Sequence, residues 1–436
     1  MFKSLFLATA ILFAACSTSG PGLFKKKSLH ETYAEKITNS GLDKTALGRS
    51  WMDAAARAIV NPQRVQIPFS ETGYFPIDHT RAAAWIFTAK RGQQLSFELS
   101  KNPVRDFIIY LELFEPAAGD RKPKLVAAAD SSGNMDPFEV KDDGEYLLRL
   151  QPELLRSGEY TLSITIGPSL AYPIKANGSG HTKSFWGAAR DNNMRKHEGI
   201  DMFAPRLTPV LAAADGYITR VNESELGGKV VWMRAAGKDY TLYYAHLDSQ
   251  LVESGKQVKT GEVLGLMGNT GNARTTSPHL HFGIYTNRGA VDPFPFVDPV
   301  PKNPAAIDGD AEKLNEWTRV SGSTRLLPSG VETTGGFTLP SNQLVRALAA
   351  IDDKYHVILP DGSSGYIPAN RLASPSSVVR TFNLQQTLPL LERPDSTSPK
   401  KLLMEKEERL QVKGYSGKYW FVKNEKGVEG WILEQK

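Results

Sequence analysis

Two histidines separated by one residue lie in a segment that reads as a β-strand. His279 and His281 belong to the run PHLHFGIY, in which apolar residues and a glycine follow the second histidine. Side chains two apart on a strand point to the same face, with Cα atoms roughly 6.5–7 Å apart. Both imidazoles therefore reach into one cavity, where one can bind a metal ion while the other stands beside it.

A second polar group comes earlier in the chain. His197 and Asp201 are four residues apart in the run HEGID, and a turn or loop there can place both side chains on one ion. One carboxylate and two imidazoles with an open fourth position are typical of a catalytic zinc site rather than a structural one. Either motif alone is weak, because a lone His-x-His is usually a surface feature, so the context has to decide.

The surrounding blocks resemble the lysostaphin-like or LytM-type zinc endopeptidases, which cut peptidoglycan peptides. The resemblance runs over residues 185–297 and rests on the order and spacing of four blocks. These blocks are FWGAARDNNMRKHEGIDMFAPRLTPVLAAADGYITRV, VVWMRAAGKDYTLYYAHLD, VKTGEVLGLMGNTGNARTTSPHLHFGIY and VDPFPFV. The family implies a compact, mostly antiparallel β metallopeptidase domain, which we expect over residues 174–300. One departure is Leu207, where the family commonly has Gly, and we interpret it as a changed loop residue without loss of chemistry.

The resemblance also implies roles for five residues and one Zn²⁺ ion. His197, Asp201 and His281 match the zinc ligands of the family, and His279 and His246 match its two catalytic histidines. Zinc lowers the pKa of a bound water to about 7, and a neighbouring histidine can take the proton as general base. His246 can position His279 or the water, or stabilise the oxyanion, and the sequence leaves this division of roles open.

Three functions are compatible with these motifs. The first is a zinc endopeptidase that hydrolyses peptide bonds in peptidoglycan stem peptides or cross-bridges during cell wall remodelling. The second is a non-catalytic wall-binding activator of an amidase, because some relatives have lost metal ligands. The presence of all five family residues favours the enzyme. The third is a zinc peptidase that acts on a protein substrate. The residues do not identify which bond is cut.

The N-terminus reads as an export signal. The apolar run Leu5 to Ala15 is too short for a bilayer-spanning helix of about 20 residues but suits a secretory signal. It ends at Cys16, the only cysteine in the chain. Residues 1–16 resemble a lipoprotein signal with Cys16 as the lipidated residue, although Phe13 stands where Leu is usual. We expect a lipid anchor in a membrane, facing the periplasm or the exterior. The alternative is ordinary cleavage nearby and a soluble secreted protein.

Length and composition indicate several globular domains. A chain of 436 residues predicts two to four domains, and 41% hydrophobic and 23% charged residues are globular values. The net charge of +5 is compatible with anionic envelope surfaces such as peptidoglycan. It is too small to argue for nucleic acid, and no basic stripe with interleaved aromatic residues occurs. The oligomeric state is not indicated.

The regions outside the expected peptidase domain are mostly β in pattern. Residues 17–63 predict a tether with one amphipathic helix, and residues 64–168 show the short alternating strands of an accessory β-sandwich. Residues 301–317 read as a linker. The chain then repeats itself in residues 318–375 and 378–436, which resemble small bacterial SH3-like barrels. In wall enzymes such modules often bind peptidoglycan.

Each repeat ends in a Gly–aromatic–Ile run, which is Gly365-Tyr366-Ile367 in the first and Gly430-Trp431-Ile432 in the second. This ending is a modest signal, because the core of any small barrel could share it. We expect His356 in the first repeat to be a surface or packing residue. The remaining histidines lie outside the metal constellation, and these are His30, His79 and His181.

Overall fold

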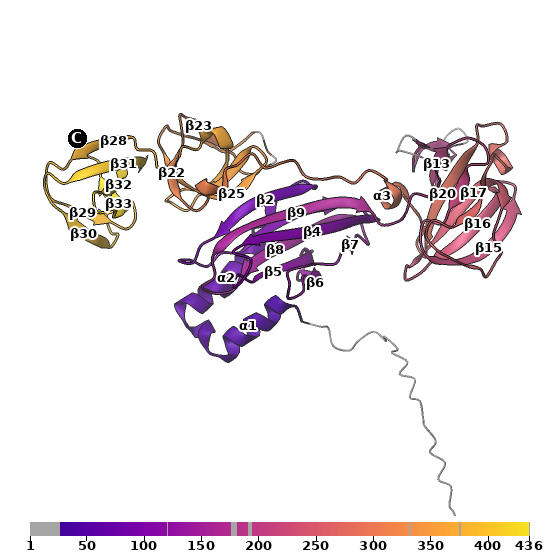
Figure 1. The fold of residues 1–436 in the computed structure, drawn as a ribbon, viewed down its shortest axis with the longest axis horizontal. Helices are drawn as coiled ribbons and strands as arrows, with labels where there is room; N and C mark the ends of the chain where they lie inside the picture. The colour runs from indigo at the N-terminus through magenta and orange to yellow at the C-terminus, as the bar shows by residue number, and fades with distance from the viewer. Residues whose placement is uncertain are drawn as a thin grey trace, which may run out of the picture.

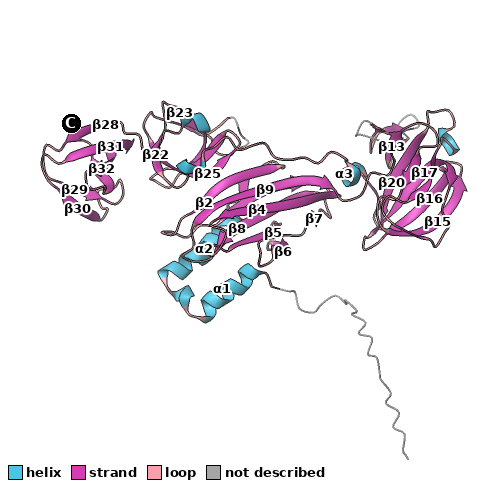
Figure 2. Ribbon diagram, viewed as in Figure 1, coloured by secondary structure: helices cyan, strands magenta, loops and turns pink. Residues whose placement is uncertain are grey.

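The computed structural model describes residues 27–119, 121–175, 181–190, 194–330, 332, 334–374 and 376–435. Across these residues the chain is mostly β, as predicted, with two longer helices near the N-terminus (Figures 1 and 2). The predicted signal and Cys16 lie outside the described residues. None of the helices that the structure describes has the length and apolar character needed to cross a membrane.

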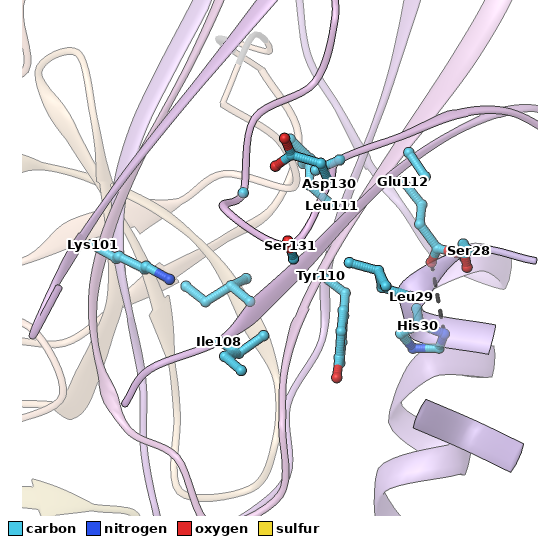
Figure 3. A pocket seen from close by; sticks show the side chains of 14 residues that line it. Ser28, Leu29, His30, Lys101, Ile108, Tyr110, Leu111, Glu112, Asp130 and Ser131 are labelled. Carbon is cyan, nitrogen blue, oxygen red and sulfur yellow. Dashed lines mark hydrogen bonds and ion pairs between the residues drawn. The ribbon is translucent and has the colours of Figure 1, made fainter. Parts of the chain in front are cut away.

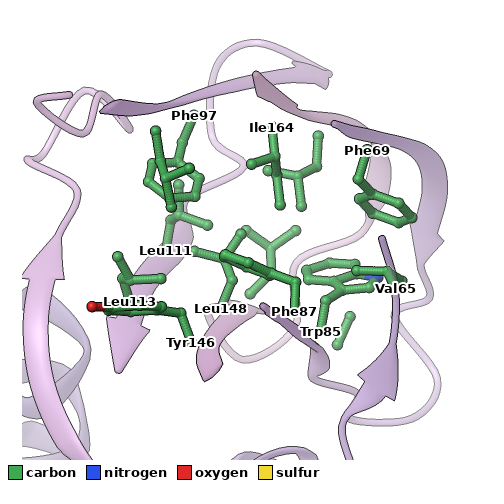
Figure 4. Packing of buried hydrophobic residues seen from close by; sticks show 14 of the residues in the cluster. Val65, Phe69, Trp85, Phe87, Phe97, Leu111, Leu113, Tyr146, Leu148 and Ile164 are labelled. Atoms are coloured by element: carbon green, nitrogen blue, oxygen red, sulfur yellow. The ribbon is translucent and has the colours of Figure 1, made fainter. Parts of the chain in front are cut away.

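Two sheets pack face to face after the helices. One has the strand order β1-β3-β8-β5-β6, and the other contains β2-β9-β4-β7. The bounds are β1 Gln63–Arg64, β2 Phe69–Phe75, β3 Ala83–Ala89, β4 Gln93–Asn102, β5 Ile109–Glu115, β6 Lys124–Ala128, β7 Phe138–Glu139, β8 Gly144–Pro152 and β9 Gly158–Pro168. Leu95 and Phe97 of β4 are buried, as their alternation predicts, in one core with Trp85, Phe87 and Leu148 of the opposite sheet (Figure 4).

Two helices precede this sandwich, α1 Leu29–Asn39 and α2 Ala46–Val60, with a 3-10 turn at Leu42–Lys44 between them. The predicted helix corresponds to α2, and the structure adds α1 in the segment for which the sequence analysis expected only a tether. A capping box starts α1, because Ser28 Oγ accepts from the Glu31 amide while the Glu31 carboxylate accepts from the Ser28 amide. The first helix is therefore encoded locally by its cap.

A buried polar network fastens these helices to the sandwich, and Figure 3 shows its members Ser28, His30 and Glu112. Arg149 of β8 donates to Glu112 of β5 and to Nδ1 of His30 in α1. An arginine only donates, so Nε2 of His30 carries the ring proton and donates it to Gln151 Oε1 at 2.6 Å. The ring stacks on Trp51 of α2, with 4.7 Å between centroids. Burial, followed by the nearby Arg149 charge, lowers the pKa of His30 to about 4.

The central region forms a 10-stranded sheet with the path β10-β13-β20-β17-β16-β15-β18 and with β14, β19 and β21 attached. The bounds are β10 Thr182–Ser184, β13 Ile200–Phe203, β14 Pro209–Leu211, β15 Gly216–Ser224, β16 Gly228–Ala235, β17 Tyr240–Gln250, β18 Gln257–Val258, β19 Val263–Met267, β20 His279–Thr286 and β21 Gly289–Val291. A separate hairpin joins β11 Ala189–Arg190 to β12 Arg195–Lys196. The short helix α3 Phe294–Val297 follows, and its Phe296 packs directly on Gly92 of the sandwich.

Two small β units complete the chain. The first contains β22 Trp317–Arg319, β23 Thr324–Leu326, β24 Phe337–Leu339, β25 Leu344–Ile351, β26 Lys354–Ile358 and β27 Ser364–Pro368. The second contains β28 Arg380–Asn383, β29 Leu388–Leu391, β30 Lys400–Met404, β31 Arg409–Ser416, β32 Tyr419–Asn424 and β33 Glu429–Leu433. Strand β25 pairs with β2 through Thr72 opposite Ala350 and Gly73 opposite Ala349. The first unit thus extends a sheet of the sandwich, although the two are distant in sequence.

We expect acid to weaken the junction between the helices and the sandwich. The pKa of His30 is about 4 in the folded chain and 6.5 when exposed, so folding favours the neutral ring. The stability that this contributes is complete above pH 6.5 and is lost as the pH falls toward 4. Linkage gives a loss of about 2 kcal/mol between pH 8 and pH 5.

Urea unfolding of the wild type and of His30→Gln over this pH range measures the effect. The variant should lack about 2 kcal/mol of the pH dependence. Equal pH dependence in the two proteins would contradict the assignment.

Candidate metal centre

Strand pairing brings the predicted ligands together. Strands β13 and β20 are antiparallel, with Asp201 directly opposite His281 and Phe203 opposite His279. Directly opposed side chains have Cβ atoms about 4.5–5.5 Å apart. His197 reaches the same point from the turn before β13. The prediction that His279 and His281 share a strand is confirmed, since both lie on β20.

Three ligand atoms form a small triangle. His197 Nε2 lies 3.0 Å from Asp201 Oδ1 and 3.0 Å from His281 Nδ1, and the latter two atoms are also 3.0 Å apart. Ligand atoms about 2.0–2.1 Å from a tetrahedral zinc ion are roughly 3.3 Å from one another. The triangle therefore has the size of three positions of a zinc coordination shell, with the fourth left open toward the cleft.

The chemistry of these atoms also fits a cation. Nδ1 of His197 donates to the carbonyl of Phe185 at 3.0 Å, so its Nε2 offers a lone pair. Burial alone would raise the pKa of Asp201, but contact with His197 and His281 outweighs it and holds the pKa well below its usual range. An ionised carboxylate and imidazole lone pairs that face one another repel unless a positive charge lies between them. Two nitrogens and one carboxylate oxygen are a donor set that zinc accepts.

Arg190 holds the outer oxygen of Asp201. Its Nη2 donates to Asp201 Oδ2 at 2.7 Å and to Ser184 Oγ at 2.7 Å. The Ser184 hydroxyl in turn lies 3.3 Å from Nδ1 of His197. Partners of this kind orient metal ligands and leave the inner oxygen for the ion. The sequence analysis missed both residues, because only the β11–β12 hairpin brings Arg190 back over the ligands.

Gly199, between the two ligands of the HEGID run, is required by close approach. A Cβ at this position would lie 2.6 Å from Cε1 of His281 and 2.6 Å from the carbonyl oxygen of Phe282. Any side chain would therefore push the His281 ring away from the triangle.

The other two predicted histidines stand beside the triangle. The ring centroids of His246 and His279 are 5.0 Å apart, and those of His246 and His281 are 5.9 Å apart. Nδ1 of His246 donates to the Thr270 carbonyl and Nδ1 of His279 to the Ser277 carbonyl, each at 2.9 Å, so both Nε2 atoms offer lone pairs. Burial, then the charges that His279 and His281 can carry, lowers the pKa of His246 to about 4.

Two residues of this region other than glycines have a left-handed backbone in the described part of the chain. His246 has φ 63°, which is uncommon outside glycine and is tolerated where the surrounding structure determines it strongly. Leu207 has φ 67°, at the position where the family commonly has Gly. Glycine adopts this conformation without steric cost, so Leu207 carries a backbone penalty that a glycine would avoid. It is half exposed and is not among the residues that line the cleft.

All five predicted residues line one cleft of about 520 Å³. Tyr243, Tyr285, Arg195 and Glu198 form further parts of its wall. Every residue that lines the cleft in the described part of the chain falls within residues 184–285. The sandwich and the C-terminal units, as far as they are described, leave the cleft uncovered.

Comparison with known proteins agrees with this site. Residues 195–293 match the model of Peptidase family M23. An uncharacterized metalloprotease of Haemophilus influenzae is 37% identical over 137 residues, which is 31% of this chain and 27% of that protein. DD-carboxypeptidase/endopeptidase Mpg of Neisseria meningitidis is 43% identical over 108 residues, 25% of this chain and 24% of its own. Peptidoglycan DD-endopeptidase ShyC of Vibrio cholerae is 37% identical over 94 residues, 22% and 21% of the two chains.

The chain therefore spans about a quarter of the length of the curated relatives it matches. The match confirms the resemblance to zinc endopeptidases for the central region and places the ligand triangle inside a Peptidase family M23 domain.

We expect Arg190 to strengthen metal binding. In Arg190→Gln the outer oxygen of Asp201 loses its charged donor, so the carboxylate can rotate away from the ion. Loss of such a partner weakens metal affinity about 10–100-fold. Competition with a chromophoric chelator measures zinc affinity directly, without an activity assay. Arg195→Gln removes a charge from the wall of the same cleft and should change the affinity little. Unchanged affinity in Arg190→Gln would refute the role.

Proposed function

We propose that this chain, which contains a Peptidase family M23 domain, is a zinc-dependent endopeptidase that hydrolyses peptide bonds in peptidoglycan stem peptides or cross-bridges. The observation that carries the proposal is the 3.0 Å triangle of His197, Asp201 and His281 at the floor of an open cleft, with two further histidines beside it. The names of two relatives, a peptidoglycan DD-endopeptidase and a DD-carboxypeptidase/endopeptidase, support this substrate class.

His197, Asp201 and His281 would hold the ion. When bound, zinc supplies a Lewis acid that polarises the scissile carbonyl and lowers the pKa of a water molecule. The open position of the triangle faces the cleft that the substrate enters. Because Arg190 occupies the outer oxygen of Asp201, only the inner oxygen is left as a ligand atom.

His279 and His246 would handle the proton. Both rings donate Nδ1–H to a backbone carbonyl, so both present an Nε2 lone pair on the cleft side. A water molecule has two protons, and two neighbouring acceptors can orient it for attack on the carbonyl. His279 then takes the proton as general base and passes it to the leaving amine. His246, which is neutral near pH 7, orients the water or the His279 ring rather than supplying a positive charge to the oxyanion.

Digestion of purified peptidoglycan tests the proposal. We expect the zinc-loaded protein to release fragments with new peptide ends, which mass spectrometry identifies together with the bond that is cut. His279→Ala should lower the rate by at least about 100-fold, because general-base catalysis contributes 10²–10⁴-fold. A chelated sample should be inactive.

His79→Ala is the matched control, since His79 is a half-buried histidine that does not line the metal cleft and should leave the rate unchanged. If the folded, zinc-bound wild type released no peptide from peptidoglycan, this substrate assignment would be wrong.

We also propose that the protein is anchored in a membrane of the cell envelope by a lipid on Cys16. The apolar run before the only cysteine supports this, as does the chemistry of the proposed substrate, which lies outside the cytoplasmic membrane.

Replacement of the cysteine tests the anchor. We expect the wild type in the membrane fraction, with a mass increase from lipid on its N-terminal peptide, and Cys16→Ser in the soluble fraction. A single acyl chain binds membranes only marginally, so the multiply acylated wild type should partition almost completely. Identical fractionation of the two proteins, without lipid on the wild type, would favour ordinary secretion.

A further inference from the structure

The two C-terminal units are the same structure repeated at a fixed interval. Strands β25 and β31 each have eight residues and start 65 residues apart. Their pairings with the next strand are interrupted at equivalent places, between Ala347 and Ala349 in the first unit and between Val412 and Gly414 in the second. A position in the first unit can therefore be compared directly with the position 65 residues later.

Two side chains at equivalent positions form a ring pair in each unit. In the first unit His356 of β26 lies opposite Tyr366 of β27, and the rings stack with centroids 4.8 Å apart. In the second unit Phe421 of β32 lies opposite Trp431 of β33, with centroids 5.0 Å apart. Since the registers agree, both pairs lie on the same face of the repeated fold. We call this the paired-ring face.

The paired-ring face of the first unit packs on the sandwich. The Tyr366 hydroxyl donates to Oε1 of Gln63 at the start of β1, and Nε2 of Gln63 donates to Nδ1 of His356 at 3.3 Å. Tyr366 belongs to the hydrophobic core of the sandwich, together with Leu327 and Ile351 of its own unit. His356 and Tyr366 are only 8% and 2% exposed, so neither ring is available to a ligand.

The paired-ring face of the second unit packs on the first unit. Phe421 and Trp431 form a separate hydrophobic cluster with Leu344 and Trp317, which belong to the first unit. The Phe421 and Trp317 rings have centroids 6.3 Å apart. A backbone hydrogen bond of 2.9 Å, from the Tyr415 amide to the Asn342 carbonyl, joins the units beside this cluster. Phe421 and Trp431 are 5% and 3% exposed.

We propose that the paired-ring face is a docking surface by which each unit attaches to an earlier part of the same chain. Its partner is the edge of the sandwich for the first unit and the β22–β25 side of the first unit for the second. The Gly–aromatic–Ile runs are therefore attachment elements, and the two units form a rigid arm on the sandwich. Contact of this arm with the wall has to use other surfaces. This inference does not depend on the proposed enzymatic function.

The burial of the rings favours docking over ligand binding. A large aromatic side chain buries about 150–250 Å² and dominates the energetics of an interface. Undocking to bind a wall fragment would expose both rings and leave the apolar partner, Leu344 or the sandwich core, in water. The same two positions carry buried rings at both junctions, although one pair is a stacked His–Tyr and the other a tilted Phe–Trp. A shared docking role explains why the residue types differ, because docking requires only that each ring keeps its position and its apolar area.

Limited proteolysis of the full chain, combined with co-sedimentation on purified peptidoglycan, tests the proposal. We expect Trp431→Ala to speed cleavage between the two units by about tenfold or more, because truncating a buried tryptophan removes most of the contact. Co-sedimentation should stay at the wild-type level. Phe337→Ala, which removes an aromatic ring that is 51% exposed on β24, should change neither measurement.

A second variant, Trp317→Ala, covers the case in which Trp431→Ala unfolds the second unit. Trp317 belongs to the first unit, on which the second unit docks, and lies outside the Gly–aromatic–Ile run. We expect the same faster cleavage from it. The proposal is overturned if Trp317→Ala is cleaved at the wild-type rate. It is also overturned if Trp431→Ala loses co-sedimentation while its cleavage rate is unchanged, since the ring would then bind the wall itself.

Discussion

The antiparallel register of β13 against β20 is the constraint on which the site depends. It places Asp201 opposite His281, and a slip of β13 by one residue would turn Asp201 to the other face of the sheet, away from His281. The neighbouring side chains hold this register. Ile200 and Met202 flank Asp201, Leu280 precedes His281, and all three are fully buried on the core side. Each such burial contributes about 1.5–3 kcal/mol, so a slip that exposed them would cost several kcal/mol. Hydrophobic burial on one face of the sheet thus positions the candidate metal ligands Asp201 and His281 on the other face.

Backbone carbonyls complete the site by setting which nitrogen of each ring is free. Phe185, Thr270 and Ser277 each accept Nδ1–H from a histidine, and this leaves Nε2 of His197, His246 and His279 as lone-pair donors. The Phe185 carbonyl follows β10, and those of Thr270 and Ser277 belong to the loop between β19 and β20. Arg190 orients the carboxylate of Asp201 in a similar way, because it donates a hydrogen bond to the outer oxygen, Oδ2. These contacts fix the orientation of the candidate metal ligands and of the two histidines beside them.

Small contacts built around buried rings join the domains. Phe296 of α3 packs on Gly92 of the sandwich, the arm docks through its ring pairs, and the helices are fastened by the His30 network. Each junction buries a ring, and two of them add hydrogen bonds to otherwise buried polar atoms. Within the described residues, none of these junctions uses a residue that lines the metal cleft. The arrangement leaves the peptidase region open on the face where the substrate would enter.

Local sequence patterns were sufficient for much of this protein. The alternation of Leu95 and Phe97 identified a half-buried strand, and the His279–His281 spacing predicted two imidazoles on one face, because strand geometry has a period of two residues. The helix α1 was missed although its capping box was present in the sequence, since the short segment before α2 was interpreted by composition alone.

The tertiary structure alone decided the contacts between residues distant in the chain. The β25–β2 pairing, the Arg190–Asp201 contact and the docked ring pairs each join segments whose spacing in sequence carries no geometric signal. Types of side chain and local period therefore determined which elements form and which residues can bind a metal. Long-range strand pairing and packing decided which of those elements meet, because they depend on surfaces that exist only after the chain has folded.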